Sequence, residues 1–333
     1  MRALVTGGGG FLGSALARKL RERGDDVRVF GRRVYTELEA IGIDCVRGDI
    51  ADYDAVRAAC EDREVIFHTA AKVGLWGSFD EYCAVNAGGT KNVLRACSQL
   101  GISKLVYTSS PSVVFNGEDI AGVDERAPYP AGFDSHYSRS KAQAEQMVLA
   151  ADHDHLSTIA LRPHLIWGPG DRHLMPRVID RAKSGRLFRI GSENKLVDTL
   201  YIDDAVQAHI LAAIQLSPLS DISGKAFFLS AGDPRPLWEI VGRMLAAAGL
   251  PPVTKRISKP LAVSAAWACE AFWRMLGASS EPPLTRFLVS QLTTAHWFDV
   301  SAAKRELGWQ PRVRMEDGME RVAQWIRAVK PYD

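Results

Sequence analysis

Cysteine and long hydrophobic runs are both scarce in this sequence. Only five of the 333 residues are cysteine and none forms a CxxC pair, so we expect neither a disulfide framework nor a metal site. No stretch of about 18 uncharged apolar residues occurs, which argues against a membrane-spanning helix. The first ten residues, MRALVTGGGG, lack the apolar core and cleavage site of a signal peptide. Together these absences predict a cytoplasmic protein.

An excess of charge of one sign is absent as well. Lysine and arginine number 41 against 39 acidic residues, and no basic run is interleaved with aromatic residues. Nucleic acid is therefore not expected as a partner. Hydrophobic residues make up 47% of the chain and charged residues 24%, which is the composition of an ordinary globular protein with a packed core.

Short apolar runs alternate with helical patterns through the first half of the chain. We expect strands over 2–6, 27–30, 44–47, 65–68, 104–108 and 157–161, with helices over 11–23, 34–40, 54–60, 86–100 and 136–151. This alternation predicts an α/β protein with a Rossmann doubly wound parallel sheet. We expect residues 1–167 to form an NADP-binding domain, to which a segment at about 197–215 returns, and residues 168–333 to form mainly a smaller substrate-binding domain.

A glycine cluster between the first strand and the first helix is a candidate cofactor site. Gly7, Gly10 and Gly13 surround Phe11 and Leu12 in the run TGGGGFLG. Glycines allow a tight turn and close approach of a pyrophosphate, and the helix N-terminus offers unpaired N–H groups. The cluster could be a turn in another kind of α/β protein, but its place between strand and helix favours dinucleotide binding.

The residues after the second strand indicate which dinucleotide is bound. NAD enzymes usually place a carboxylate there, whereas this chain has Arg32 and Arg33. Two guanidinium groups suit the 2′-phosphate of NADP(H), so NAD(H) is the less favoured cofactor, although both arginines could simply be solvated. Asp49, followed by Ile50, could accept a hydrogen bond from adenine or cap the next helix.

Tyr137 and Lys141 form the candidate catalytic pair. They are four residues apart on a predicted helix and therefore share one face. A neighbouring ammonium would lower the pKa of a tyrosine hydroxyl from about 10, so Tyr137 could exchange a proton with a substrate oxygen. The spacing alone is common, but Ser109 and Ser110 follow the fifth strand at the sheet edge where such folds bind ligands.

These motifs occur in the order that is seen in extended short-chain dehydrogenases/reductases, which the chain resembles over nearly its whole length. The matching segments are 7–13, Asp49, 70–71, 86–90, 109–110, Tyr137 with Lys141, 161–163 and 168–170. The resemblance implies a catalytic triad of Ser110, Tyr137 and Lys141, with Ser109 as the alternative serine. It gives Asn86 a supporting role, although Asn86 could instead cap a helix. Further cofactor contacts are expected from Ala70, Ala71, Lys72, Ser109, Pro163 and Leu165.

Other segments narrow the resemblance to the 3β-hydroxysteroid dehydrogenase branch. Segments 107–113, 283–286 and 296–299 are similar to that branch, and 70–78 with 161–171 to bacterial reductases of long-chain keto acids. This implies an NADPH-dependent oxidoreductase of lipid metabolism that reduces the 3-keto group of a long-chain (2-alkyl-)3-oxoalkanoate to the 3-hydroxy acid. A 3β-hydroxysteroid or sterol dehydrogenase, an NAD-dependent sugar-nucleotide epimerase and a non-catalytic NADP sensor remain alternatives.

Pro111 and Pro163 weigh against two of the sugar-nucleotide activities. Sugar-nucleotide dehydratases of this superfamily resemble one another in an acidic pair directly after the catalytic residue, where Pro111 and Ser112 stand here. Epimerases often carry asparagine at the position of Pro163. The ketoreductase remains the leading hypothesis.

An apolar small-molecule substrate is the expected partner, together with a homodimer like those of the family. Ser110, Trp76, His136, His164 and Trp167 are candidates for the substrate pocket, and Lys72 or His136 could hold a carboxylate. The segment 261–276 is rich in large apolar residues, with Glu270 and Arg274 as its only charges. We expect an ordinary core helix there, with an acyl pocket or a peripheral membrane contact as alternatives.

Overall fold

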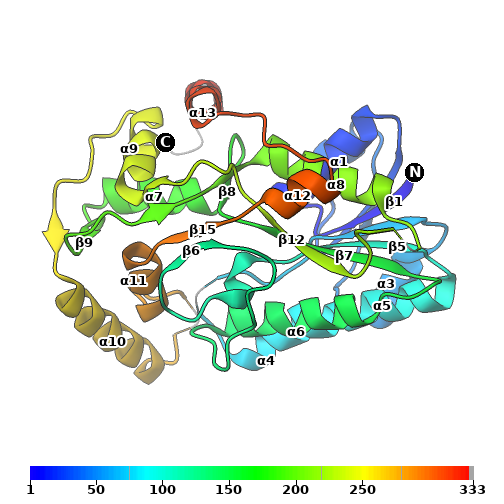
Figure 1. Ribbon diagram of the computed structural model, residues 1–333, viewed down its shortest axis with the longest axis horizontal. Coiled ribbons are helices and arrows are strands. Elements are labelled where there is room, and N and C mark those ends of the chain that lie inside the picture. Colours follow the sequence, from blue (N-terminus) through cyan, green and yellow to red (C-terminus); the bar gives the residue numbers. More distant parts are fainter. Residues whose placement is uncertain (75, 219, 279, 330–333) are drawn as a thin grey trace.

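A seven-stranded parallel sheet forms one half of the molecule (Figure 1). The computed structural model describes residues 1–329 except 75, 219 and 279. From edge to edge the strands are β12 (Lys225–Leu229), β7 (Ser157–Pro163), β5 (Lys104–Thr108), β4 (Val65–His68), β1 (Arg2–Thr6), β2 (Asp26–Gly31) and β3 (Asp44–Arg47). The strand order reverses between β1 and β4, where doubly wound sheets bind ligands. The Rossmann sheet predicted from the sequence is thereby confirmed.

Helices cover both faces of this sheet, because its central strands are apolar on both sides. Helices α1 (Phe11–Glu22) and α8 (Ile202–Gln215) pack together on one face. The other face carries α3 (Tyr53–Cys60), α5 (Gly89–Leu100) and α6 (His136–Ala150). Helix α8, within the segment at about 197–215, contacts β5 and β7.

Three segments depart from the sequence-based expectation. Strand β12 joins the sheet although it lies beyond the expected return segment. Its apolar residues Phe227, Phe228 and Leu229 are buried, and the strand pairs with β7. The helix expected over 34–40 is only the short α2 (Thr36–Glu39). The helix expected to begin at residue 86 starts earlier with a π-helical turn, η1 (Cys83–Gly88), which continues into α5. Such turns are frequent at functional sites.

The other half of the molecule consists of small sheets and helices (Figure 1). Its four-stranded sheet has the order β13 (Arg235–Pro236), β10 (Leu196–Val197), β15 (His296–Phe298) and β6 (Ile120–Val123), and two strand pairs are β11 (Leu200–Tyr201) with β8 (Ile166–Trp167) and β14 (Arg256–Ile257) with β9 (Arg189–Ile190). The helices are α7 (Leu174–Lys183), α9 (Leu237–Ala247), α10 (Lys259–Met275), α11 (Arg286–Thr293), α12 (Ser301–Glu306) and α13 (Met315–Val329). Among the described residues, no helix is long and apolar enough to cross a membrane.

Candidate active site

The glycine turn after β1 forms a cradle for an anion. Gly7 adopts a left-handed conformation with φ +71°, and a Cβ there would lie 2.7 Å from the Ala70 backbone. Its N–H donates to the Phe30 carbonyl at 2.8 Å, which holds the turn against β2. Helix α1 then begins at Phe11, and its N-cap Gly10 supplies no side-chain cap. The first N–H groups of α1 therefore remain available for phosphate oxygens, as a dinucleotide requires.

Two residues that the sequence patterns did not reveal also lie at this turn. A side chain at Gly9 would overlap the ring of Tyr35, so this ring lies across the glycine turn. Arg172, from the other half of the chain, donates from Nη1 to the Gly9 carbonyl at 3.2 Å. Only the folded chain brings these residues together, because the tyrosine lies at the N-cap of α2 and the arginine follows α1 by some 150 positions in sequence. By contrast, the side chain of Leu12 is buried in the core, so only its backbone faces the cradle.

The edge of the sheet beyond β2 carries the expected basic pair. Arg32 and Arg33 are exposed in the bend that directly follows β2. At the end of β3 the exposed Asp49 accepts from the Ala51 N–H at 2.9 Å. The expectation that Asp49 might cap α3 is wrong, because the cap is Asp52, whose carboxylate accepts from the first N–H groups of that helix. The adjacent Ile50 is a buried core residue that packs against α5.

A buried chain of hydrogen bonds lies beneath the glycine turn. Thr90 donates from Oγ1 to the Asn86 carbonyl at 2.6 Å, so it accepts from His68 Nε2 at 2.9 Å. The ring proton of His68 is thereby assigned to Nε2, and Nδ1 accepts from the Thr6 hydroxyl at 2.7 Å. Burial, reinforced by the charge of Lys141, lowers the pKa of His68 to about 3, so the imidazole is neutral. A fixed neutral network of this kind holds the ends of β1 and β4 in register.

Asn86 connects the loop after β4 to helix α6 by hydrogen bonds. Its side chain exchanges two hydrogen bonds with the Lys72 backbone, accepting at 2.7 Å and donating at 3.1 Å. The same amide donates to Ser140 Oγ at 2.8 Å, and Ser140 donates to the carbonyl of Tyr137. Asn86 lies within the π-helical turn and is not a helix cap, so the structural alternative raised by the sequence is excluded.

Tyr137 lies in the first turn of α6, beside Ser110. Burial raises the pKa of the Tyr137 hydroxyl, and a hydrogen bond from Ser110 opposes that rise. Ser110 is itself fixed as the cap of η2 (Pro111–Val114), where its Oγ accepts from the Ser112 N–H at 3.2 Å. The structure therefore places the hydroxyl of Ser110 beside that of Tyr137.

Lys141 lies one turn along α6 from Tyr137 and is 2% exposed. Its ammonium donates to the Thr108 carbonyl at 2.7 Å and lies 4.2 Å from the centre of the Tyr107 ring. Burial lowers the pKa of Lys141 to about 7, although the charge of Glu145 acts in the opposite direction. In this structure the hydroxyl of Ser110 lowers the pKa of Tyr137.

Ser109, Pro163 and Leu165 lie where β5 and β7 end. The Ser109 N–H donates to the Leu161 carbonyl at 2.6 Å, while its buried hydroxyl has no hydrogen-bond partner. An unpaired buried hydroxyl costs free energy unless a ligand or water satisfies it, which fits a cofactor-facing position. Pro163 ends β7, and Leu165 just beyond it has φ +41°, an uncommon conformation for a branched residue.

A loop and a short helix, α4 (Phe79–Tyr82), lie beside Tyr137. The Tyr82 ring centre is 6.5 Å from that of Tyr137, and the Tyr82 hydroxyl donates to the Trp76 carbonyl at 3.0 Å. The half-buried Trp76 ring donates from Nε1 to the Ala278 carbonyl at 3.0 Å. His136 is exposed at the start of α6 and lies against Phe79. Trp76 therefore lies close to α6, and His136 is the first residue of that helix. Both positions are compatible with contact to a substrate beside Tyr137.

Three further residues that were predicted to contact the substrate already have partners within the protein. Lys72 forms an ion pair with Glu81, so a substrate carboxylate would have to displace that partner. His164 is buried and forms a 2.8 Å hydrogen bond with His296. Trp167 is buried and donates to Thr199 Oγ1 at 2.9 Å. We therefore correct the assignment of His164 and Trp167 to the substrate pocket, because His296 and Phe298 of β15 cover His164 and Tyr201 of β11 covers Trp167.

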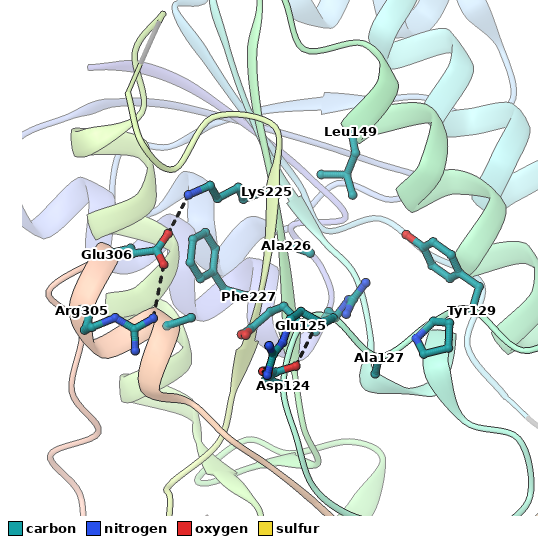
Figure 2. Close-up of a pocket in the computed structure, with 14 residues that line it drawn as sticks. Asp124, Glu125, Ala127, Tyr129, Leu149, Lys225, Ala226, Phe227, Arg305 and Glu306 are labelled. Carbon is teal, nitrogen blue, oxygen red and sulfur yellow. Dashed lines mark hydrogen bonds and ion pairs between the residues drawn. The ribbon is translucent and has the colours of Figure 1, made fainter.

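A cavity of about 690 Å³ opens elsewhere, between β12 and the loop that precedes α6 (Figure 2). Its lining is strongly charged and comprises Asp124, Glu125, Arg126, Ala127, Pro128, Tyr129, Leu149, Arg162, Lys225, Ala226, Phe227, Ala302, Arg305 and Glu306. Ser110, Tyr137 and Lys141 are not among these residues. The cavity is thus separate from the catalytic candidates, and its charges do not suit an apolar substrate. No cluster of side chains that could hold a metal ion occurs in the described part of the chain.

The fold and this site define an oxidoreductase of the short-chain dehydrogenase/reductase class, built to use a nicotinamide dinucleotide. The chain belongs to the 3-beta hydroxysteroid dehydrogenase/isomerase family, whose model matches residues 4–259.

Individual relatives agree with this membership. The chain is 48% identical to the 2-alkyl-3-oxoalkanoate reductase of Stenotrophomonas maltophilia, over 97% of this chain and 98% of the relative. It is 45% identical to the enzyme of the same name from Shewanella oneidensis, over 96% and 85%. Among solved structures, MoeE5 in complex with UDP-glucose and NAD is similar with a TM-score of 0.76 and 26% identity, over 98% of this chain and 99% of MoeE5.

Proposed function

We propose that this protein is an NADPH-dependent reductase that converts the 3-keto group of a long-chain 2-alkyl-3-oxoalkanoate into the 3-hydroxy acid. The observation that carries the substrate class is the 45–48% identity, over nearly the whole chain, to two reductases named for that substrate. The pairing of Ser110 with Tyr137 supports the reaction type, because both hydroxyls can contact one carbonyl oxygen.

The chain's own residues supply binding and the proton. When bound, the nicotinamide ring supplies the hydride for C3. Tyr137 donates its hydroxyl proton to the carbonyl oxygen, and Ser110 holds that oxygen by a hydrogen bond. Lys141 is positioned to hydrogen-bond a ribose hydroxyl and, when protonated, to stabilise the tyrosinate that remains. Because burial lowers the pKa of Lys141 to about 7, its charge responds to what binds beside it.

We further propose NADP(H) as the cofactor, held at its 2′-phosphate by Arg32 and Arg33. Both guanidinium groups are exposed at the end of β2, where an NAD enzyme would present a carboxylate. Tyr35, which lies across the glycine turn between Gly9 and Gly31, is a further candidate contact at this end. Replacing Arg32 and Arg33 by alanine should raise KM for NADPH about 10- to 100-fold and leave KM for NADH nearly unchanged. An equal effect on both cofactors would contradict this assignment.

A 3β-hydroxysteroid dehydrogenase is the second candidate, because the family description names that activity. A substrate panel separates the two functions. Purified protein is given NADPH with a long-chain 2-alkyl-3-keto acid, a 3-ketosteroid or a short 3-keto ester, and the loss of NADPH absorbance is followed. We expect the long-chain keto acid to have the highest kcat/KM. A preference for the ketosteroid would transfer the assignment to the sterol branch, and no oxidation with any ketone would reopen the epimerase and sensor alternatives.

We also propose that the protein is a homodimer that associates through α5 and α6, which sedimentation of the purified protein would test.

A further inference from the structure

Helix α10 turns large apolar side chains toward solvent. Trp267 is 63% exposed and Met275 75%, and Leu261 and Phe272 are exposed to about the same degree. At 100° per residue these side chains share one face with Ser264, Ala268 and Ala271, and that face carries no charge. An ordinary surface helix has the opposite arrangement. In Figure 1 the helix lies at the outer edge of the C-terminal half, far from the seven-stranded sheet.

The opposite face of α10 attaches it to the protein through small and charged groups. Ala262 and Ala266 are fully buried in a small cluster with Ile190 and Val289. Glu270 is also buried, and its carboxylate accepts from the backbone and side chain of Arg286 at 2.7 and 3.0 Å. The expectation of an ordinary core helix over 261–276 is therefore wrong, since the largest apolar side chains are those that the fold leaves uncovered.

The end of α10 leads directly to the active site. Trp76 donates to the carbonyl of Ala278, just past the helix, and the guanidinium of Arg274 lies 5.6 Å from the Trp76 ring. The Trp76 carbonyl accepts from Tyr82, whose ring lies against Tyr137. A contiguous series of contacts thus joins the exposed apolar face to the catalytic tyrosine.

The segment that contains α10 carries net positive charge. Segment 255–286 contains five basic residues and two acidic ones. The five are Lys255, Arg256, Lys259, Arg274 and Arg286. The two acidic residues are Glu270, which is buried, and Glu281, which pairs with Arg177 at 2.7 Å. An uncharged apolar face on a segment with exposed basic side chains and net positive charge matches a surface of anionic lipid, where apolar side chains enter the acyl region and cations meet phosphate.

We propose that α10 is a lipid-docking helix, which lies in the plane of an anionic membrane surface and admits the substrate past Trp76. The proposal rests on the proposed function for its substrate, a long-chain acid that partitions into lipid. The helix is too short and too firmly attached to span a membrane, and it binds reversibly through one face. A second copy of the chain or a protein partner on the same face is the competing occupant.

Vesicle sedimentation tests the docking without any substrate. The full-length protein is mixed with vesicles of phosphatidylcholine alone or with phosphatidylglycerol, and the bound fraction is measured at low and high salt. We compare a triple variant, Trp267→Gln with Phe272→Gln and Met275→Gln, with the control Ile214→Gln. Ile214 is a half-exposed apolar residue on α8, in the other half of the molecule. Unfolding midpoints of all variants show that each remains folded.

The expected result is binding to anionic vesicles that weakens with salt and falls at least about 100-fold in the triple variant, with the control unchanged. Equal sedimentation of wild type and triple variant, or none of wild type, overturns the proposal. So does a triple variant that halves the particle mass in solution, because the face would then bind a second copy.

Turnover separates this proposal from the proposed function. A short, soluble 3-keto ester should be reduced equally by wild type and triple variant, whereas a long-chain keto acid held in anionic vesicles should be reduced at least about 10-fold more slowly by the variant. Vesicle binding without reduction of any ketone would refute the proposed function and still support the lipid-docking helix. Normal turnover of the vesicle-held substrate by the triple variant would refute the docking role alone.

Discussion

Helices α6 and α10 both reverse the usual placement of polar and apolar side chains, and they do so in opposite senses. Helix α6 buries Lys141 and Glu145 beside Ser140, whereas α10 exposes Trp267 and Met275. The buried Lys141 on α6 favours a functional role, because ionisable groups with shifted pKa values cluster at functional sites. An exposed apolar face on α10 indicates a surface that something else covers. The buried charge on α6 accompanies the proposed catalysis, and the exposed apolar face of α10 accompanies the proposed access of an apolar substrate.

The cost of burying charge on α6 is offset by a second buried charge. Arg162 on β7 donates from Nε and Nη2 to the Glu145 carboxylate at 2.9 and 2.6 Å. Tyr129 donates to the same carboxylate at 2.6 Å. Glu145 in turn favours the protonated form of Lys141. The ion pair therefore supports the helix that carries Lys141, and it has no counterpart on the outward face of α10.

The largest expected effect is the loss of turnover when Tyr137 is replaced by phenylalanine. The change removes the proton donor, and we expect kcat to fall about 10²- to 10⁴-fold while NADPH still binds. Stopped-time assays of NADPH oxidation and quenching of protein fluorescence by NADPH measure the two properties. The control is Tyr82→Phe, which removes the neighbouring hydroxyl that binds Trp76 and should leave kcat within about 10-fold. Retention of activity by Tyr137→Phe would remove Tyr137 from the mechanism.

The second largest effect is expected on the free energy of unfolding when the buried ion pair is broken. Replacing Glu145 by glutamine leaves Arg162 buried without its partner, and the free energy of unfolding should fall by about 3–5 kcal/mol. The matched change Glu306→Gln breaks a more exposed pair with Lys225 and should cost at most about 1 kcal/mol. Urea unfolding followed by circular dichroism compares the variants. Equal losses of unfolding free energy in the two variants would show that the buried ion pair stabilises the fold no more than the exposed pair does.

The pH dependence of stability tests the charge of Lys141. Its pKa falls from the usual 10.5 to about 7 in the folded chain, so the unfolded chain binds more protons between those values. Stability contributed by this group should therefore rise with pH across that window, by about 1.4 kcal/mol per unit. The quantity to measure is the difference in unfolding free energy between wild type and Lys141→Met at pH 7, 8 and 9. A difference that does not change with pH would mean that Lys141 keeps its ordinary pKa.

The smallest effect is expected on the outward face of α10. Replacing Trp267 by glutamine should change the free energy of unfolding by no more than about 0.5 kcal/mol, because the ring is largely solvated already. The same change at Trp309, which is fully buried, should cost several times more, about 3 kcal/mol or above. Comparable losses at the two tryptophans would show that Trp267 is packed in solution and that its face is covered.

Local sequence signals were sufficient for the Rossmann half. A strand, a glycine turn and a helix adjoin one another at Gly7, and α6 carries Tyr137 and Lys141 on one helical face, so short-range rules predict both. The parts that failed depend on distant packing. His164 resembles a pocket residue until His296 of β15 covers it, and a short sequence cannot show that contact. The orientation of α10 could not be read from its composition either, since a helix that is apolar on most sides fits a core equally well.

The central claim is that this chain reduces a 3-keto acid by hydride transfer with Tyr137 as the proton donor. The most direct measurement uses NADPH deuterated at the nicotinamide C4 position, a long-chain 2-alkyl-3-keto acid and mass spectrometry of the product. The account predicts a 3-hydroxy acid that carries one deuterium atom at C3, formed by wild type and not by Tyr137→Phe. A product without deuterium at C3, or equal product from the variant, would contradict it.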